Sequence, residues 1–290
     1  MASRILGQID ISRYDLAKDI KILNSITKLP EEYDEFGQGY WKNLSIYNAS
    51  GRAEDSQFRK SDECLRTEYA SKCPEIQRLV EDNFKFTHLK MVRARSLVDG
   101  MVIPHRDFVE LEKSTTYFRA FVALETNNES FHSDEFGVFQ MKAGEVWFLD
   151  AGINHAAVNF GLGSRMFLCL DFMFEGKLNT NNIFAECVST TTHRNSFYVD
   201  RKPLDERAIE LIINSTAGIL NRHTFKDIVF ALSKYHFLYD IPVACCYDWI
   251  IASAEMISDN EIIRKAKSMQ KYLIEKRDIG ERYVINDWQV

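Results

Sequence analysis

Two histidines and an aspartate have the residue types and the spacing of a metal site. In His105-Arg106-Asp107, the possible ligands are two residues apart and directly follow the apolar run Met101–Pro104. Alternate side chains of an extended chain point to the same face, so these two can converge on one ion. His155 lies in a later run typical of a strand and offers a third ligand.

The spacing alone is weak evidence, because the sequence contains it twice. The second instance, His132-Ser133-Asp134, follows the polar stretch Thr126–Phe131, and we predict that it lies in a loop. The strand context therefore favours His105, Asp107 and His155 as the ligands.

Two imidazoles and one carboxylate leave three positions of an octahedral ion open, which is the arrangement of non-heme Fe(II) oxygenases. Arg165 follows His155 within the otherwise apolar run Gly163–Leu170. A buried guanidinium needs a carboxylate partner. An isolated histidine is more often a core or surface residue, and an isolated arginine an ion-pair partner. The order and strand context of all four residues favour a site instead.

These residues lie in a region whose hydrophobic pattern has the period of two that is typical of strands. Eight short runs are separated by Gly, Asn, Asp and Ser, and they are residues 88–90, 91–95, 101–104, 117–124, 137–141, 146–149, 155–160 and 165–174. Short strands without intervening helices predict an all-β barrel or jelly roll.

The region before the strands is mixed and polar. Residues 11–83 contain a helix-like stretch at Tyr14–Ile26 and an aromatic patch at Tyr33–Trp41. We expect them to flank the strand region.

The last part of the chain has a helical pattern. Asp205–Leu220 and Ile241–Ala254 suit helices, and Thr224–Asp227 and Ser258–Glu261 have the spacing of capping boxes. The residues expected on one buried helix face are Ile262, Ala266, Met269 and Leu273. We therefore predict a jelly-roll catalytic domain with its flank at 1–178 and a helical domain at 179–290. The helical domain would support the barrel or form a homodimer interface.

Composition excludes several classes of function. The chain has 36 Lys+Arg against 42 Asp+Glu, a net charge of -6, and no basic stripe for nucleic acid. No signal peptide or membrane-spanning run is evident, so we expect a cytoplasmic protein that does not bind membranes. The six cysteines show no Cys-x-x-Cys pair, and we expect reduced packing residues. The motifs of serine hydrolases, P-loop proteins and dinucleotide-binding folds are absent.

With these residues in this order, the chain resembles the Fe(II)/2-oxoglutarate-dependent dioxygenases with a double-stranded β-helix core. It most resembles the bacterial free-L-proline hydroxylases, and among them the proline 3-hydroxylases. The likeness runs from Ile5 nearly to the C-terminus. The stretches that carry it are 103–111, 144–151, Trp41 with 48–51, and 231–236.

The resemblance implies a role for each candidate residue. His105, Asp107 and His155 would bind Fe(II), and Arg165 would bind the distal carboxylate of the cosubstrate 2-oxoglutarate. Many relatives have Ser two residues after that arginine, but this chain has Phe167. The hydroxyl that assists Arg165 would therefore come from elsewhere or be absent. The substrate carboxylate would meet arginines, for which we expect Arg95 and Arg119 first and Arg93 third.

The activity implied is hydroxylation of a free cyclic L-amino acid by O2, with 2-oxoglutarate converted to succinate and CO2. L-Proline at C3, giving cis-3-hydroxyproline, is the first expectation. Hydroxylation at C4 or of L-pipecolate is the alternative within the same chemistry. A peptide side-chain hydroxylase and a non-catalytic cupin-like binding module are the alternatives from other classes.

Overall fold

The computed structural model describes residues 2–30, 34–59, 61–107, 116–176, 180–185, 198–278 and 281–288. Its strands are β1 (Arg4–Gln8), β2 (Gly37–Asn48), β3 (Leu65–Arg66), β4 (Leu89–His105), β5 (Thr116–Ala123), β6 (Ser130–Asp134), β7 (Gly137–Phe139), β8 (Glu145–Phe148), β9 (His155–Asn159), β10 (Met166–Phe174), β11 (Lys202–Pro203) and β12 (Tyr239–Asp240). Its helices are α1 (Leu16–Ser25), α2 (Glu68–Lys72), α3 (Pro74–Asn83), α4 (Glu206–Ile219), α5 (Phe225–Leu232), α6 (Tyr235–Leu238), α7 (Cys245–Met256) and α8 (Asn260–Gln270). Short helical turns span Ile11–Arg13, Thr180–Ile183 and Lys271–Glu275.

Two antiparallel sheets share the long strand β4. Its first half pairs with β10, which continues through β5 to β8, and we call this the first sheet. Its second half pairs with β9, which continues through β6 to β7, and we call this the second sheet. β1 pairs with β8 at the edge of the first sheet, and β2 pairs with β4. This order is that of a double-stranded β-helix, so the predicted jelly roll is confirmed.

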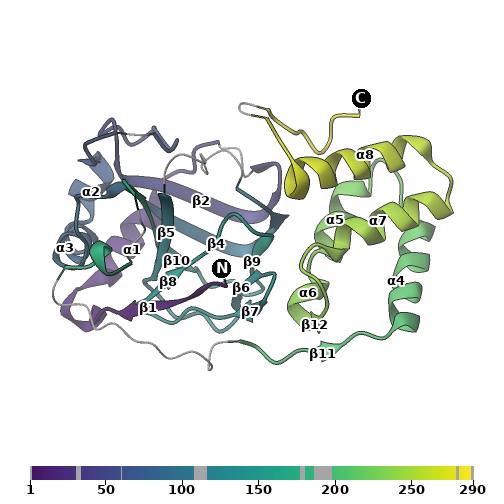
Figure 1. The fold of residues 1–290 in the computed structure, drawn as a ribbon, viewed down its shortest axis with the longest axis horizontal. Coiled ribbons are helices and arrows are strands. Elements are labelled where there is room, and N and C mark those ends of the chain that lie inside the picture. The colour runs from purple at the N-terminus through teal and green to yellow at the C-terminus, as the bar shows by residue number, and fades with distance from the viewer. Residues whose placement is uncertain are drawn as a thin grey trace.

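Helices cover the outer faces of both sheets (Figure 1). Helices α1 to α3 pack against the first sheet in a cluster that includes Leu23, Leu79 and Leu168. Helices α4 to α8 lie on the other side, where one apolar cluster joins Met101 and Val158 to residues of α5, α7 and α8. The second sheet and the C-terminal helices therefore share a core, and the division at residues 178 and 179 stays a prediction.

Most of the predicted helices are confirmed. Tyr14–Ile26 contains α1, Asp205–Leu220 contains α4, and Ile241–Ala254 overlaps most of α7. The residues of the predicted helix face are all buried, namely Ile262, Ala266, Met269 and Leu273.

The two predicted capping boxes are wrong. Thr224 has helical backbone angles and makes no side-chain cap, and its hydroxyl donates back to the Ile219 carbonyl instead. The cap of α8 is Asp259, which accepts from the amides of Glu261 and Ile262, one residue later than expected. Within the described part of the chain, no helix combines the length and the apolar character that crossing a membrane requires.

The described cysteines form no disulfide, as expected. Four of them are buried, and burial raises the pKa of the Cys73 thiol to about 12. Cys187 lies outside the described residues.

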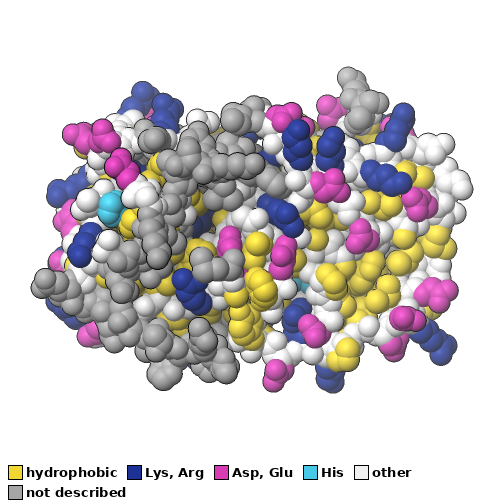
Figure 2. Space-filling view, in the orientation of Figure 1, with side chains coloured by type: hydrophobic (Ala, Val, Ile, Leu, Met, Phe, Trp, Pro, Cys, Tyr) yellow, Lys and Arg dark blue, Asp and Glu magenta, His cyan; other side chains and the backbone are white. Residues whose placement is uncertain are grey.

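The surface of the helical half carries several exposed apolar side chains (Figure 2). The largest exposures among them are 62% for Ile219, 58% for Leu211, and 56% for Leu238 and Met256. The homodimer interface expected on these helices stays a prediction.

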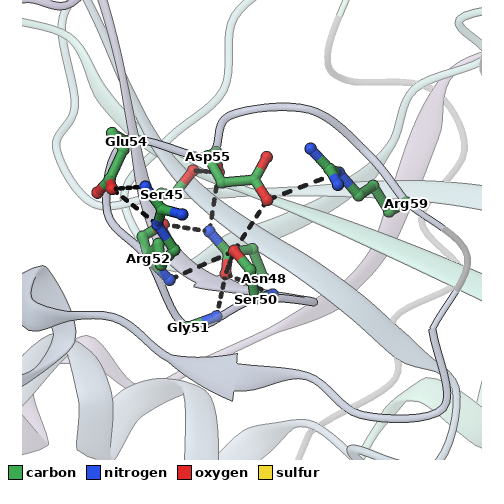
Figure 3. A network of polar contacts seen from close by, with 8 residues as sticks. All are labelled: Ser45, Asn48, Ser50, Gly51, Arg52, Glu54, Asp55 and Arg59. Carbon is green, nitrogen blue, oxygen red and sulfur yellow. Dashed lines mark hydrogen bonds and ion pairs between the residues drawn. The ribbon is translucent and has the colours of Figure 1, made fainter.

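The 48–51 motif builds a loop at the end of β2 (Figure 3). The Asn48 Oδ1 accepts from the Gly51 amide at 2.7 Å, and its Nδ2 donates to the carbonyls of Arg52 and Asp55 at 2.7 and 2.8 Å. The Asn48 side chain therefore bonds to both backbone amides and backbone carbonyls of the loop. We infer that the motif fixes the backbone conformation of this loop. The rest of the loop reaches the jelly roll, where the Phe58 ring lies edge-on against Tyr117.

Candidate metal centre

The structure brings the three predicted ligands together. His105 is the last residue of β4, His155 is the first residue of β9, and the two pair across the strands. Asp107 follows β4, and its amide donates to the Ala151 carbonyl. One possible ligand atom from each of His105, Asp107 and His155 lies within 4.8 Å of the others, and all three residues are buried.

The two imidazoles are held in the same way. In each ring Nδ1–H donates to a carbonyl two residues earlier, Ile103 for His105 and Ile153 for His155, at 2.9 Å. This bond leaves Nε2 without its proton and available as a ligand atom. Burial lowers the pKa of His105 to about 3 and also lowers the pKa of His155. Both rings are therefore neutral, as metal ligands must be.

The two oxygens of Asp107 have different neighbours. Oδ1 lies 3.7 Å from Nε2 of His105, and Oδ2 accepts a hydrogen bond from Nη1 of Arg119. Burial alone would raise the pKa of the Asp107 carboxyl. The charge of the Arg119 guanidinium instead holds the pKa of this carboxyl well below its usual range. The carboxylate is therefore ionised, with one oxygen turned toward the histidines.

The three arginines expected to bind substrate are all buried in the jelly roll. Arg95 lies near two rings, with its guanidinium carbon 5.7 Å from the centroid of Trp41 and 5.8 Å from that of Phe121. Arg93 and Arg119 both bind Asp171, a residue of β10 that sequence reasoning missed. The sequence signal that could have identified Asp171 is the one that identified Arg165, namely a charged residue within an apolar run.

Arg165 is 2% exposed and immediately precedes β10. Its Nη1 donates to the Ser130 hydroxyl at 3.3 Å, and its guanidinium carbon lies 4.5 Å from the centroid of the Phe167 ring. Among the described residues, the Nε of Arg165 has no hydrogen-bond partner. A hydroxyl thus reaches Arg165 from β6, although the position two residues after it is phenylalanine.

The prediction of a loop at His132-Ser133-Asp134 is wrong, since these residues belong to β6 and are buried. The His132 ring lies among Phe121, Phe139 and Phe167, with centroids 5.4 to 5.9 Å away. Burial, followed by the charge of Arg165, lowers the pKa of His132 well below its usual value. A neutral histidine therefore lies inside the jelly roll near Arg165. Residues 108–111 of the 103–111 motif lie outside the described residues.

Comparisons with known proteins place this fold and site in a class. The family model "Aspartyl/Asparaginyl beta-hydroxylase" matches residues 15–174, which include the jelly roll and the three candidate ligands. The chain is therefore an enzyme of this hydroxylase class.

The family within that class is shown by matches over the whole chain. The family model "L-proline 3-hydroxylase, C-terminal" matches residues 181–281. L-proline cis-3-hydroxylase 2 of Streptomyces sp is 38% identical over 99% of this chain and 100% of its own length, and L-proline cis-3-hydroxylase 1 is 36% identical over the same shares. L-proline cis-4-hydroxylase of Rhizobium meliloti is 28% identical over 97% of this chain and 99% of its own length. The chain belongs to the L-proline hydroxylase family, as its motifs predicted.

Proposed function

We propose that this protein hydroxylates a free cyclic L-amino acid with Fe(II), 2-oxoglutarate and O2, and that its substrate is L-proline, attacked at C3. The observation that carries the proposal is the convergence of His105, Asp107 and His155 in a chain related over its whole length to L-proline cis-3-hydroxylases.

The donor set fits Fe(II). Neutral imidazole and ionised carboxylate suit a divalent iron, and the pKa shifts of the three residues favour these protonation states. The Nε2 atoms of His105 and His155 and the Oδ1 of Asp107 would hold the ion. When bound, the iron supplies the activation of O2 that replaces a ring hydrogen by hydroxyl, with decarboxylation of 2-oxoglutarate.

Arg165 would bind the distal carboxylate of 2-oxoglutarate. Its guanidinium is buried, and its contacts in the described residues are a hydroxyl and an aromatic ring. A buried charge of this kind is costly without an anionic partner, so a carboxylate ligand supplies what the surrounding residues do not. The Ser130 hydroxyl donates to the Val158 carbonyl and accepts from Arg165, so its role would be to orient the guanidinium toward that carboxylate.

Arg95 is our first choice for the carboxylate of the amino acid. The nearby Trp41 and Phe121 rings are apolar surroundings, in which the attraction of a guanidinium for a carboxylate is stronger than in water. Arg119 and Arg93, which both bind Asp171, are the next candidates.

The alternative position, C4 of proline, rests on the similarity to L-proline cis-4-hydroxylase. Both activities use the same residues and differ in which C–H bond is held nearest the iron. L-Pipecolate is the homologue with a six-membered ring. A peptide side-chain hydroxylase would have no free carboxylate for Arg95, and a binding module would show no turnover.

The test measures succinate formed from 2-oxoglutarate in the presence of Fe(II) and either L-proline, L-pipecolate or a proline peptide. We expect L-proline to stimulate succinate formation and NMR of the product to show cis-3-hydroxyproline. His105→Ala should abolish the stimulation, and Arg95→Ala should raise the KM for L-proline more than that for 2-oxoglutarate. Preference for the peptide, or no turnover with any cyclic amino acid, would refute the proposal.

A further inference from the structure

Asp171, to which the proposed function gives no role, is the centre of a buried polar cluster. Its side chain is fully buried on β10. Oδ1 accepts from Nε of Arg119 at 2.8 Å and from the Tyr117 hydroxyl, and Oδ2 accepts from Arg93. Burial would raise the pKa of the Asp171 carboxyl, but Arg119 and Arg93 lower it to about 2. The Asp171 carboxylate is therefore ionised, and its orientation is fixed by these hydrogen bonds.

Arg119 connects this cluster to the candidate metal centre. Its Nε binds Asp171, and its Nη1 binds Oδ2 of Asp107. A guanidinium is planar and rigid, so fixing Nε also fixes the direction in which Nη1 points. Because Asp171 and Arg119 face each other in the register of β10 and β5, the bond between them is set by the sheet. The sheet thus determines where Arg119 meets Asp107.

We propose that Asp171 is a positioning residue for the metal site. It aims Arg119 at Oδ2 of Asp107, which keeps Oδ1 turned toward the two imidazoles and makes Asp107 a ligand through one oxygen. The proposal rests on the function proposed above, in which these three residues bind Fe(II). Arg119 then acts on the metal ligand, and capture of the substrate carboxylate falls to Arg95.

A purely structural ion cluster would stabilise the fold without affecting the metal. A buried ion pair is weak evidence for a stabilising role, since hydrophobic replacements are often neutral or stabilising. Residues that orient metal ligands, by contrast, typically change metal affinity when they are altered. Metal affinity therefore separates the two roles.

The test compares wild type with Asp171→Asn by anaerobic titration of the metal-free full-length protein with Fe(II) and with Co(II). Asparagine keeps the size of the side chain but not its charge or its two acceptor oxygens. We expect the affinity for both metals to fall on the order of 10- to 100-fold and the visible spectrum of bound Co(II) to change.

Asp19→Asn is the matched control. Asp19 is 2% exposed and accepts from the amides of Glu75 and Ile76 at 2.8 Å, outside the jelly roll. This control also loses a buried carboxylate, here one that accepts from backbone amides, and its metal affinity should equal that of wild type.

Arg119→Lys keeps the inference testable if Asp171→Asn does not fold. Lysine retains the charge, but its single nitrogen cannot replace the two coplanar nitrogens with which Arg119 binds Asp171 and Asp107. We expect an affinity loss of about 10-fold for Fe(II). Wild-type metal affinity in the folded variants, or an effect confined to the KM for the amino acid, would overturn the inference. Failure of wild type itself to bind Fe(II) would refute the proposed function, which is a separate result.

Discussion

At the scale of single residues, Ser130 provides the hydroxyl that the sequence motif lacks beside Arg165. The resemblance led us to expect a serine where this chain has Phe167, and the structure places the Ser130 hydroxyl 3.3 Å from Nη1 of Arg165 instead. The partner comes from β6, a strand distant in sequence. Ser130 should therefore orient Arg165 toward the carboxylate that the arginine is proposed to bind.

We predict that Ser130→Ala raises the KM for 2-oxoglutarate about 10-fold, because one hydrogen bond to a charged group is lost. The KM for L-proline should change little. Steady-state kinetics with each substrate varied in turn measures both values. Ser133→Ala is the control, since Ser133 lies on the same strand and bonds to His236 instead. An equal rise of the two KM values in Ser130→Ala would contradict the prediction.

The candidate metal ligands could be proposed from sequence, whereas Asp171, which we propose positions one of them, could not. Metal chemistry demands particular residue types at short spacings, so His105 and Asp107 could be recognised from their own segment. Asp171 meets Arg119 only because β10 lies beside β5 in a particular register. Strand order and register depend on tertiary packing, so they cannot be predicted from the sequence of a single segment.

At the scale of elements, the backbone of the long strand β4 lies very close to the backbone of its neighbour β2. Near its middle, β2 and β4 meet at Gly39 and Gly100, and a Cβ on Gly100 would lie 2.0 Å from the Gln38 carbonyl oxygen. Gly39 has a φ of +77°, in the region that favours glycine. No side chain fits between the strands at this crossing. Apart from His88, the three predicted runs at 88–90, 91–95 and 101–104 lie in the single strand β4, which pairs in both sheets.

Gly100→Ala should lower the free energy of unfolding by about 1–3 kcal/mol, because backbone atoms would have to move apart. Gly218→Ala is the matched control. Gly218 lies in α4 with nothing within 4 Å of the added carbon, so alanine should stabilise the helix by about 0.5–1 kcal/mol. Urea unfolding of both variants gives the two changes. Equal effects of the same sign would show that the crossing tolerates a side chain.

The 231–236 motif links α6 to β6. His236 is 1% exposed, and its Nε2 lies 2.8 Å from the Ser133 hydroxyl. Burial, followed by the charge of Arg201, lowers the pKa of His236 to about 3 from an ordinary value of 6.5. Between these pH values the unfolded chain binds a proton that the folded protein does not. The free energy of unfolding therefore falls as the pH falls below 6.5.

We predict that His236→Gln removes this part of the acid sensitivity. Glutamine can still bond to Ser133 but does not titrate. Between pH 6.5 and 5, wild type should lose about 1.5 kcal/mol more unfolding free energy than the variant. Denaturant unfolding at several pH values measures how the free energy of unfolding changes with pH. His223→Gln, at an exposed histidine, is the control. Parallel pH profiles of wild type and His236→Gln would contradict the prediction.

The strand β6 was missed because its two faces are both buried and both partly polar. Along it, His132 contacts rings inside the jelly roll and Ser133 bonds to a residue of α6. Alternation identifies a strand only when one face is apolar and the other is solvated. A polar strand between a ligand-binding interior and a covering helix gives no such signal.

At the scale of the whole molecule, the C-terminal helices contact the end of β4, where the candidate metal ligand His105 lies. The Tyr247 hydroxyl of α7 donates to the Pro104 carbonyl, and the Arg106 amide donates to the Leu273 carbonyl. These contacts lie on the two sides of His105. The sequence predicted a helical half that supports the barrel or forms an oligomer interface, but the contact points with the barrel depend on how the helices pack. The helical half thus bears directly on the geometry of the site.

This arrangement predicts that Tyr247→Phe, which removes one buried hydrogen bond, lowers both stability and metal affinity. The free energy of unfolding should fall by about 1 kcal/mol, and Fe(II) affinity should fall severalfold because the end of β4 is held less firmly. Tyr283→Phe is the matched control, since its hydroxyl donates to the Lys265 carbonyl at 3.1 Å within the helical half. It should lose similar stability and keep wild-type metal affinity. If both variants bind Fe(II) as wild type does, the helices stabilise the fold without positioning the metal site.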